Sequence, residues 1–365
     1  MTEHVFQRFV ERVVRQVWVT MAEKKQSILI VRRDNIGDLV LTTPMFEAIR
    51  RRYPDAYIGV LVNSYNAPAI DGNMFVDDIF AYTKGKHAGS SVLGAHWRRL
   101  QLIWRLRRQR FDVVILPNGG FAARALRFAR LLKPRRIVGF FSGTPPAGLT
   151  VPIAHAGGEH LHETEDICRL LAPLDVLGPI PGLTVVPDQA LADKISAALP
   201  AAFARAAGPV VALHLSARKE KQRWPVDRFA ELARQLHATH GARFLVFWSP
   251  GDENNPFHPG DDGKAARLLS KIADLPVAPV RTGALAELIA GLSLADFAVL
   301  SDGGAMHLAA GLGKPLVCFF GNSPARRWHP WRVPYELLQK PSEDVGDISV
   351  EEAVLAFGRL ALVAA

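Results

Sequence analysis

The sequence predicts an α/β protein in which two domains, each built on a parallel β-sheet, face each other across a cleft. The first observation is length, because 365 residues exceed the roughly 250 to 300 that one hydrophobic core supports. The second is the alternation of short β-rich runs with helical patterns, which is typical of βα units. The third is a proline-rich segment near the middle of the chain, which divides these units into two series.

Eight apolar runs of strand length make up the two series. The first half carries runs at 27–31, 57–62, 112–116 and 136–140, and the second half carries runs at 210–215, 243–248, 297–301 and 315–320. Each series has enough strands for a sheet of its own. The composition agrees, since 49% of the residues are hydrophobic and 22% are charged, as in ordinary folded proteins.

The predicted linker is the segment 171–188, LAPLDVLGPIPGLTVVPD. Its four prolines and two glycines disfavour regular helices and strands, so we expect the domain boundary between residues 180 and 190. Open α/β sheets bind ligands outside the carboxyl ends of their strands. Functional side chains should therefore lie in the loops that follow the predicted strands.

The excess positive charge is confined to the first half of the chain. Residues 1–185 hold 25 Lys and Arg against 16 Asp and Glu, whereas residues 186–365 hold 19 against 19. Such an excess predicts an anionic partner, which can be a membrane surface, a phosphorylated substrate or nucleic acid. No helix-turn-helix, RNA-recognition or zinc-finger pattern is present, which disfavours nucleic acid. The clustered basic residues are Arg98, Arg99, Arg105, Arg107, Arg108, Arg110, Arg124, Arg127, Arg130, Lys133, Arg135 and Arg136.

Residues 4–20, HVFQRFVERVVRQVWVT, form a predicted basic amphipathic helix. It can lie on an anionic membrane surface or pack on the protein's own body, and both alternatives remain open. The sequence shows no secretory signal and no apolar run near the ~20 residues of a spanning helix. Cys168 and Cys318 lie far apart without CxxC spacing, which fits a reducing compartment.

The stretch RRDNIGD (32–38) follows the first predicted strand, and its Asp38 can be either a helix cap or a functional acid. If the helix began at Asp38, Pro44 would fall in its second turn and cost up to ~3 kcal/mol. With Thr43 as the cap and Pro44 at the first helical position, this cost disappears. Asp38 is then expected in a loop, free for chemistry.

The stretch LSDGGAMHLAAGLGKPLVCFFG (300–321) predicts a strand, a glycine turn and a helix. Gly303 and Gly304 at the helix start can offer backbone N–H groups to phosphate oxygens. Asp302 is a poor neighbour for a diphosphate, so we expect it to accept hydrogen bonds from sugar hydroxyls or backbone N–H groups. His307 can face the ligand or lie in the core.

The stretch HLSARKEKQRWP (214–225) places a hydroxyl and several cations at another strand end, a pattern that suits a diphosphate and also fits a solvated charge run. The residues concerned are Ser216, Arg218, Lys219, Lys221 and Arg223.

Other kinds of site are disfavoured. GLGKP does not complete a phosphate-binding loop, and no GxGxxG follows the first strand. The segment GGEHLHETED (157–166) lacks HExxH spacing, and a helix start with acids in its first turn is a better interpretation than a zinc site.

Three stretches together, RRDNIGDLVLTTP, RKEKQRWPVDRFAELARQL and SDGGAMHLAAGLGKPLVCFFG, resemble glycosyltransferase family 9, the bacterial heptosyltransferases that build the inner core of lipopolysaccharide. The resemblance covers roughly residues 27–360 and implies a GT-B fold of two Rossmann-like domains. Its expected parts are an amino-terminal extension (1–26), an acceptor-binding domain (27–185), a nucleotide-sugar-binding domain (186–345) and a final helix (346–365) packed back on the first domain.

The resemblance also implies a reaction, the inverting and metal-independent transfer of heptose from ADP-heptose to a lipopolysaccharide core acceptor. It makes Asp38 the general base and assigns stabilisation of the departing ADP to Lys221, Ser216 and the glycine turn. Further expected donor contacts are Arg218, Glu253, Asp302 and His307, and the expected acceptor contacts are Gly37 and Arg124.

The likeness has departures and leaves alternatives. Gln222 stands where the family often has lysine, so Lys219, Lys221 and Arg223 all remain candidates for the donor contact. The alternatives are another nucleotide sugar, another acceptor, or a non-catalytic nucleotide-sugar-binding protein. We expect an anionic glycolipid partner, no nucleic acid, no cofactor beyond the nucleotide sugar, no metal, and a cytoplasmic enzyme peripheral on the inner membrane.

Overall fold

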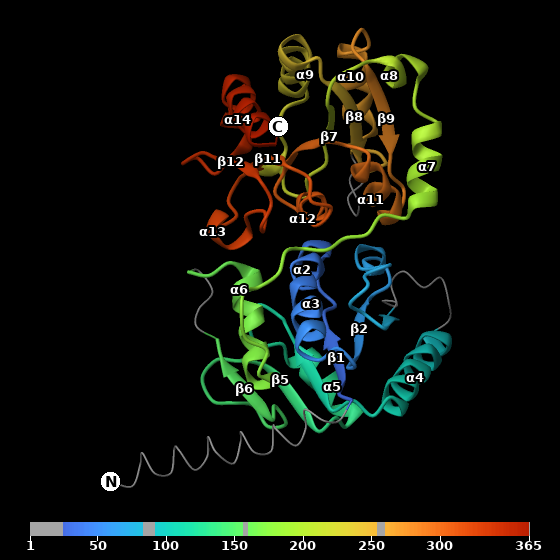
Figure 1. Ribbon diagram of the computed structural model, residues 1–365, viewed down its shortest axis with the longest axis vertical. Helices are drawn as coiled ribbons and strands as arrows, with labels where there is room; N and C mark the ends of the chain where they lie inside the picture. The colour runs from blue at the N-terminus through green and yellow to red at the C-terminus, as the bar shows by residue number, and fades with distance from the viewer. Residues whose placement is uncertain (1–24, 83–91, 156–159, 254–259, 365) are drawn as a thin grey trace.

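The computed structural model describes residues 25–82, 92–155, 160–253 and 260–364, which form two α/β units stacked one above the other (Figure 1). The chain passes from the lower to the upper unit through an extended segment between residues 175 and 188. The predicted boundary at 185/186 falls in this segment and stays a prediction. The predicted amphipathic helix at 4–20 lies outside the described residues.

Each unit contains one six-stranded parallel sheet, and the two sheets share one strand order. The first runs β3-β2-β1-β4-β5-β6 and the second runs β12-β11-β10-β7-β8-β9, which are both the doubly wound order of Rossmann-like folds. The predicted pair of parallel-sheet domains is therefore confirmed. The strands are β1 (Ser27–Val31), β2 (Tyr57–Asn63), β3 (Asp78–Tyr82), β4 (Val113–Leu116), β5 (Arg136–Phe141), β6 (Val151–Ala154), β7 (Val210–His214), β8 (Arg243–Trp248), β9 (Val277–Arg281), β10 (Phe297–Ser301), β11 (Leu316–Phe320) and β12 (Tyr335–Gln339).

The eight predicted strands are the inner strands of the two sheets. The four strands that the sequence did not predict, β3, β6, β9 and β12, are the four edges. Proline is tolerated at an edge, where an N–H group can stay unpaired, and β6 and β9 contain Pro152 and Pro279. Edge strands also carry exposed positions, which shortens the apolar runs that reveal a strand in the sequence.

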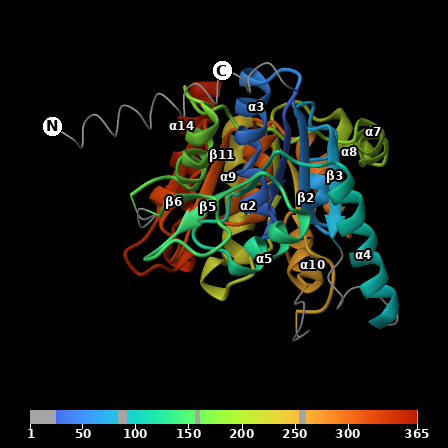
Figure 2. The ribbon, with the colours of Figure 1, turned by 90° about the horizontal axis from the view of Figure 1, so that it is seen from below.

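Helices cover both faces of each sheet, and none of those described is long and apolar enough to cross a membrane. Figure 2 shows the first unit from below, with α4 along its outer edge beside β3. The helices are α2 (Ile36–Val40), α3 (Thr43–Arg52), α4 (Val92–Arg108), α5 (Ala123–Leu132), α6 (Glu163–Cys168), α7 (Gln189–Ala197), α8 (Ala201–Arg205), α9 (Val226–His240), α10 (Asp262–Lys271), α11 (Leu285–Ser293), α12 (Gly304–Gly311), α13 (Ala325–Trp328) and α14 (Val350–Ala364).

The final helix, α14, packs on the second unit, so the prediction that it returns to the first domain is wrong. It contacts α9, β11 and β12 (Figure 1). The Phe357 ring lies 5.1 Å from that of Phe297, and it belongs to a buried cluster that also contains Phe319. The second sheet needs a helix on this face, and the apolar stripe of α14 covers it.

The two units share one buried apolar cluster, which includes Val40 of α2, Val185 of the connection and Met306 of α12. Hydrogen bonds also cross the junction. The Val185 N–H donates to the Gly311 carbonyl at 2.9 Å, and the ring Nε2 of His162 donates to the His329 carbonyl at 2.9 Å. The two halves are therefore held by buried contacts as well as by the covalent connection.

Two buried histidines make the stability of this fold dependent on pH. Burial lowers the pKa of His162 to about 3 and the pKa of His214 to about 4, because the charged ring would lose its hydration. The unfolded rings titrate near pH 6.5, so below that value the unfolded state binds more protons. The stabilisation from neutral rings is complete above pH 6.5 and is lost as the pH falls.

We predict that the free energy of unfolding falls by about 2 kcal/mol for each of these two rings when the pH is lowered from 7 to 5. Denaturant unfolding at the two pH values measures the change. His214→Leu should reduce the pH dependence, whereas His160→Gln, a change at an exposed ring, should preserve it. An equal pH dependence in wild type and His214→Leu would contradict the assignment.

Candidate active site

A buried arginine organises the loop that follows β1. The Arg32 side chain is 1% exposed, and its guanidinium lies 3.0 Å from Asp38 Oδ1 and 2.9 Å from Glu163 Oε1. Its Nε lies 3.3 Å from Asp34 Oδ2. Burial disfavours the charged guanidinium, but the three carboxylates outweigh this and raise the pKa of Arg32. One cation thus fixes three acids around the end of the strand.

Asp38 lies in the short helix α2 and not in a loop, which corrects the expectation from Pro44. Asn35 is the N-cap, and Asp38 Oδ2 accepts hydrogen bonds from the Asn35 backbone N–H at 3.0 Å and side-chain amide at 2.9 Å. The helix ends at Val40, and α3 starts separately with Thr42 as its N-cap, one residue before the expected Thr43. The break between α2 and α3 accommodates Pro44.

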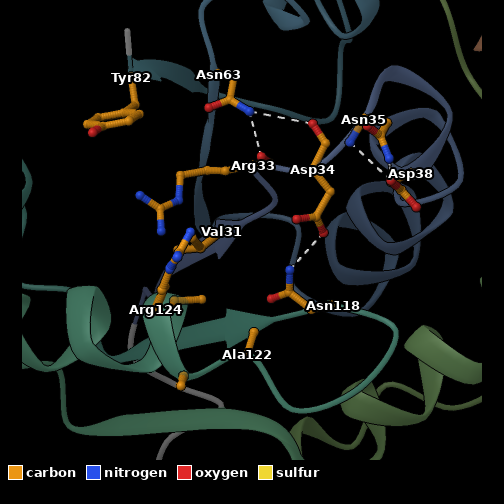
Figure 3. Close-up of a pocket in the computed structure, with 12 residues that line it drawn as sticks. Val31, Arg33, Asp34, Asn35, Asp38, Asn63, Tyr82, Asn118, Ala122 and Arg124 are labelled. Carbon is orange, nitrogen blue, oxygen red and sulfur yellow. Dashed lines mark hydrogen bonds between the residues drawn. The ribbon is translucent and has the colours of Figure 1, made fainter. Parts of the chain in front are cut away.

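The carboxylate of Asp38 therefore has a fixed orientation. Its Oδ2 accepts two hydrogen bonds and its Oδ1 accepts one, from Arg32. A carboxylate oxygen has two lone-pair sites, so Oδ1 retains one for a further donor. Asp38 also lines a pocket of about 820 Å³ at the carboxyl edge of the first sheet (Figure 3).

The other side of this pocket is basic. Figure 3 shows the side chains of Arg33 and Arg124 together, away from Asp38. Arg33 also contacts the Tyr82 and Phe128 rings, whose centroids are 5.5 Å and 5.1 Å from its guanidinium carbon. The pocket therefore offers a carboxylate at one end and two guanidinium groups at the other.

The floor of the pocket spans the point where the strand order of the first sheet reverses. Asn118, after β4, donates to Asp34 Oδ2 at 2.7 Å, which ties the loop after β4 to the loop after β1. The Tyr65 hydroxyl donates to the Asp34 carbonyl at 2.7 Å. Asp34 therefore shapes the turn, and the Asn118 amide holds its carboxylate.

The ion pairs around Arg32 extend into the second unit. Glu163, at the start of α6, is 1% exposed and pairs with Arg32 through one oxygen and with Arg327 of α13 through the other. Arg327 also lies 3.3 Å from Asp166 Oδ2. Asp38, Arg32, Glu163 and Arg327 thus form one chain of ion pairs across the junction, which we call the junction network.

The glycine turn of the second unit meets the Asp38 turn directly. A Cβ at Gly37 would lie 2.6 Å from His307 Cδ2, and a Cβ at Gly304 would lie 3.2 Å from Ile36 Cβ. Gly37 is not among the residues that line the pocket. Because glycine has no side chain, the His307 ring can pack directly against it. Burial lowers the pKa of His307, although the charges of Asp302 and Asp38 oppose the change. His307 is therefore both buried and next to the candidate base.

The residues predicted to contact the donor have different environments. Asp302 Oδ2 accepts a hydrogen bond from the buried Gln222 at 3.0 Å, so Gln222 holds Asp302, whereas Lys219 and Lys221 are exposed. The Ser216 hydroxyl donates to Asp261 and accepts from the Ser249 N–H at 2.8 Å. Ser216 thus connects the ends of β7 and β8.

Arg218 is exposed and Glu253 is partly exposed in the second unit. Glu253 Oε1 lies 3.5 Å from an Arg267 nitrogen. Burial and the nearby carboxylate of Asp38 raise the pKa of Tyr65, and the charge of Arg218 opposes this rise. An exposed cation of the second unit is thus within electrostatic reach of the tyrosine beside the Asp38 turn.

The predicted helix start at 157–166 is confirmed for its described part, because α6 begins at Glu163 with three acids in its first turn. His155 lies 3.2 Å from Asp166, and His162 accepts from the Thr164 N–H. Among the residues that the structure describes, no three His, Cys, Asp or Glu side chains converge as metal ligands would.

Two Rossmann-like domains that face each other at the carboxyl ends of their sheets are the architecture of the GT-B fold. Residues 99–349 match the sequence model of glycosyltransferase family 9 (heptosyltransferase). The chain belongs to this family and is a glycosyltransferase, as the three sequence stretches predicted.

Known relatives cover most of the chain. The lipopolysaccharide heptosyltransferase 3 of Escherichia coli is 24% identical over 302 residues, which are 81% of this chain and 83% of that protein. The E. coli ADP-heptose lps heptosyltransferase II structure has a TM-score of 0.73 at 17% identity and covers 93% of this chain and 99% of its own. The E. coli heptosyltransferase WaaC with ADP has a TM-score of 0.71 at 19% identity, with coverages of 92% and 100%. These structures confirm the fold.

We predict that Glu163→Gln lowers the free energy of unfolding by about 3 to 5 kcal/mol, because it removes the buried carboxylate charge that Arg32 and Arg327 share. Denaturant unfolding measures the loss. The matched control is Asp274→Asn, which breaks an exposed ion pair with Arg234 and should change stability by less than about 1 kcal/mol. Equal effects of the two changes would show that the junction network does not stabilise the fold.

We predict that Gly37→Ala destabilises the protein by about 1 to 3 kcal/mol, because the added methyl group overlaps the His307 ring. His307→Ala in the same chain should relieve the overlap, so the two changes should not be additive. Gly182→Ala is the control, because no atom lies within 4 Å of its added Cβ. Additive losses in the double variant would place the effect of Gly37→Ala elsewhere.

Proposed function

We propose that this glycosyltransferase transfers heptose, with inversion, from ADP-heptose to a hydroxyl group of a lipopolysaccharide core acceptor. The observation that carries the proposal is the direct contact between the Asp38 turn and the glycine turn, made through Gly37 and His307. Glycosyl transfer needs a proton acceptor beside the attacking hydroxyl and positive charge beside the departing diphosphate. The two turns supply these functions from opposite domains.

The donor is proposed to lie on the second domain. Gly303 is exposed at the start of α12, where backbone N–H groups and the helix dipole favour phosphate oxygens. Asp302, held by Gln222, accepts hydrogen bonds from sugar hydroxyls, and Glu253 accepts them from the ribose. The ADP bound to WaaC and the ADP-heptose named for heptosyltransferase II support an adenine nucleotide donor.

The exposed cations Lys221 and Arg218 are proposed to close on the diphosphate when the donor binds. Ser216 then acts by positioning the loop that carries them, since its hydroxyl is already bonded to Asp261.

In the proposed step, Asp38 Oδ1 takes the proton of the acceptor hydroxyl as that oxygen forms a bond to the anomeric carbon. The bond from the anomeric carbon to the diphosphate oxygen breaks on the opposite face of the sugar, so the configuration inverts. The electron pair of this bond leaves with ADP. Lys221 and the α12 N–H groups, rather than a metal ion, stabilise the charge that ADP gains.

The acceptor is proposed to occupy the pocket of about 820 Å³ on the first domain. This volume is in the range of small-ligand sites, and it places Asp38 within the same space as Arg33 and Arg124. Guanidinium groups bind phosphate and carboxylate groups through paired hydrogen bonds. An acceptor whose reactive hydroxyl lies near an anionic group fits this arrangement.

We predict that Asp38→Asn lowers the rate of heptose transfer about 10²- to 10⁴-fold, because an amide cannot accept the proton. Binding of ADP, measured by calorimetry, should remain nearly as tight as in wild type, since the donor contacts lie on the other domain. Asp55→Asn, at an exposed aspartate of the first domain, is the control for transfer.

Transfer by Asp38→Asn at the wild-type rate would contradict the role of Asp38 as base. Tighter binding of UDP- or GDP-sugars than of ADP-heptose in the same calorimetry would overturn the proposed donor and leave the reaction class intact. Binding of ADP-heptose without transfer to any core acceptor would favour a non-catalytic nucleotide-sugar-binding protein.

A further inference from the structure

The helix α4 carries an exposed apolar stripe on its outer face. The side chains of Trp97, Leu100 and Trp104 are 63%, 59% and 62% exposed. Their spacing places them on one side of a helix, since successive residues turn by about 100°. Leu106, on the opposite side, is fully buried against the first sheet, and Leu102 and Ile103 pack beside it. The stripe is therefore not the face by which α4 packs on its own domain.

Arginines border this stripe. The helix contains five arginines and no acidic residue. The Arg108 guanidinium carbon lies 4.5 Å from the centroid of the Trp104 ring, so cation and indole form part of one surface. Arg105 fixes the helix to β3, because it lies 3.6 Å from Asp78 and 5.0 Å from the centroid of the Phe80 ring. We call the exposed surface of Trp97, Leu100, Trp104, Arg107 and Arg108 the α4 face.

The helix α4 packs on β3, the strand whose last residue lines the proposed acceptor pocket. Figures 1 and 2 both place α4 at the outer edge of the first domain, and Figure 2 shows β3 beside it. Tyr82 at the end of β3 lines the pocket. Burial lowers the pKa of Arg33, and the positive charge of Arg99 on α4 lowers it further. One end of the helix is thus within electrostatic reach of a pocket residue.

We propose that the α4 face docks the enzyme on an anionic lipid bilayer, with the tryptophans in the interface and the arginines on the lipid headgroups. This inference rests on the proposed function, because docking on a bilayer would bring the pocket to a glycolipid acceptor in that bilayer. Tryptophan is enriched at membrane interfaces, and each arginine near an anionic surface contributes about 1 kcal/mol.

The charge of the helix decides among the surfaces that could cover the stripe. A second copy that used the same face would bring five arginines of one helix against those of the other, without any acid on α4 to offset them. Residues 4–20 of the chain are also basic, with Arg8, Arg12 and Arg15 against Glu11. An anionic bilayer is the partner whose charge is complementary.

Co-sedimentation of the full-length chain with lipid vesicles tests the proposal. The protein should bind vesicles of phosphatidylethanolamine with about 30% phosphatidylglycerol, should not bind phosphatidylcholine vesicles, and should dissociate as salt screens the headgroups. Trp97→Ser with Trp104→Ser should weaken binding about tenfold or more. Arg107→Gln with Arg108→Gln should weaken it about thirtyfold.

Matched controls lie on the second domain. Leu355→Ser on α14 removes an exposed apolar side chain, and Arg205→Gln on α8 removes an exposed cation, and both should bind as wild type does. Circular dichroism checks that each variant is folded. Asp38→Asn should also bind vesicles normally, so loss of transfer would not disturb this result and loss of vesicle binding would not disturb the proposed chemistry.

Three outcomes would overturn the proposal. The first is a wild-type chain that binds neither kind of vesicle, and the second is a tryptophan double variant that binds as tightly as wild type. The third is a dimer in light scattering that dissociates in the tryptophan double variant while vesicle binding stays unchanged, because the α4 face would then be a protein interface.

Discussion

The structure of the site depends on one buried cation, Arg32. A guanidinium that is 1% exposed must be neutralised where it lies, and Asp34, Asp38 and Glu163 surround it for that reason. Because Glu163 shares its second oxygen with Arg327, the same charge compensation reaches the other domain. The orientation of the candidate base and the junction of the two domains are therefore parts of one electrostatic arrangement.

The contact between the two turns has a steric basis as well. Glycine at position 37 and glycine at position 304 each leave space that a neighbour from the opposite domain fills, namely His307 and Ile36. Backbone can approach this closely only where no Cβ intervenes. Together with the junction network, this packing places the turn that carries Asp38, the proposed base, against the start of α12, the proposed phosphate-binding helix end.

The inner strands were predictable because they are buried on both faces and form continuous apolar runs, such as the run that contains Leu29 in β1. The edge strands β3, β6, β9 and β12 were not, because exposure and proline interrupt their patterns. Local rules also misplaced Asp38, since Pro44 excludes one continuous helix but does not exclude two short ones. The sequence did not reveal which sheet α14 packs on, because an apolar stripe shows that a helix is covered but not by which partner.

By itself the sequence determined two parallel-sheet domains, the glycine turns after particular strands, and the family. Each depends on a local feature of the chain: apolar runs for the buried strands, glycine residues for the turns, and the order of the motifs for the family. Only the tertiary structure decided that Arg32 binds Asp38, that Glu163 joins Arg32 to Arg327, and that Gln222 holds Asp302. It also decided that Gly37 faces His307. Glu163 lies 131 positions from Arg32 and 164 positions from Arg327, and no local pattern records which of many charged residues will be buried together.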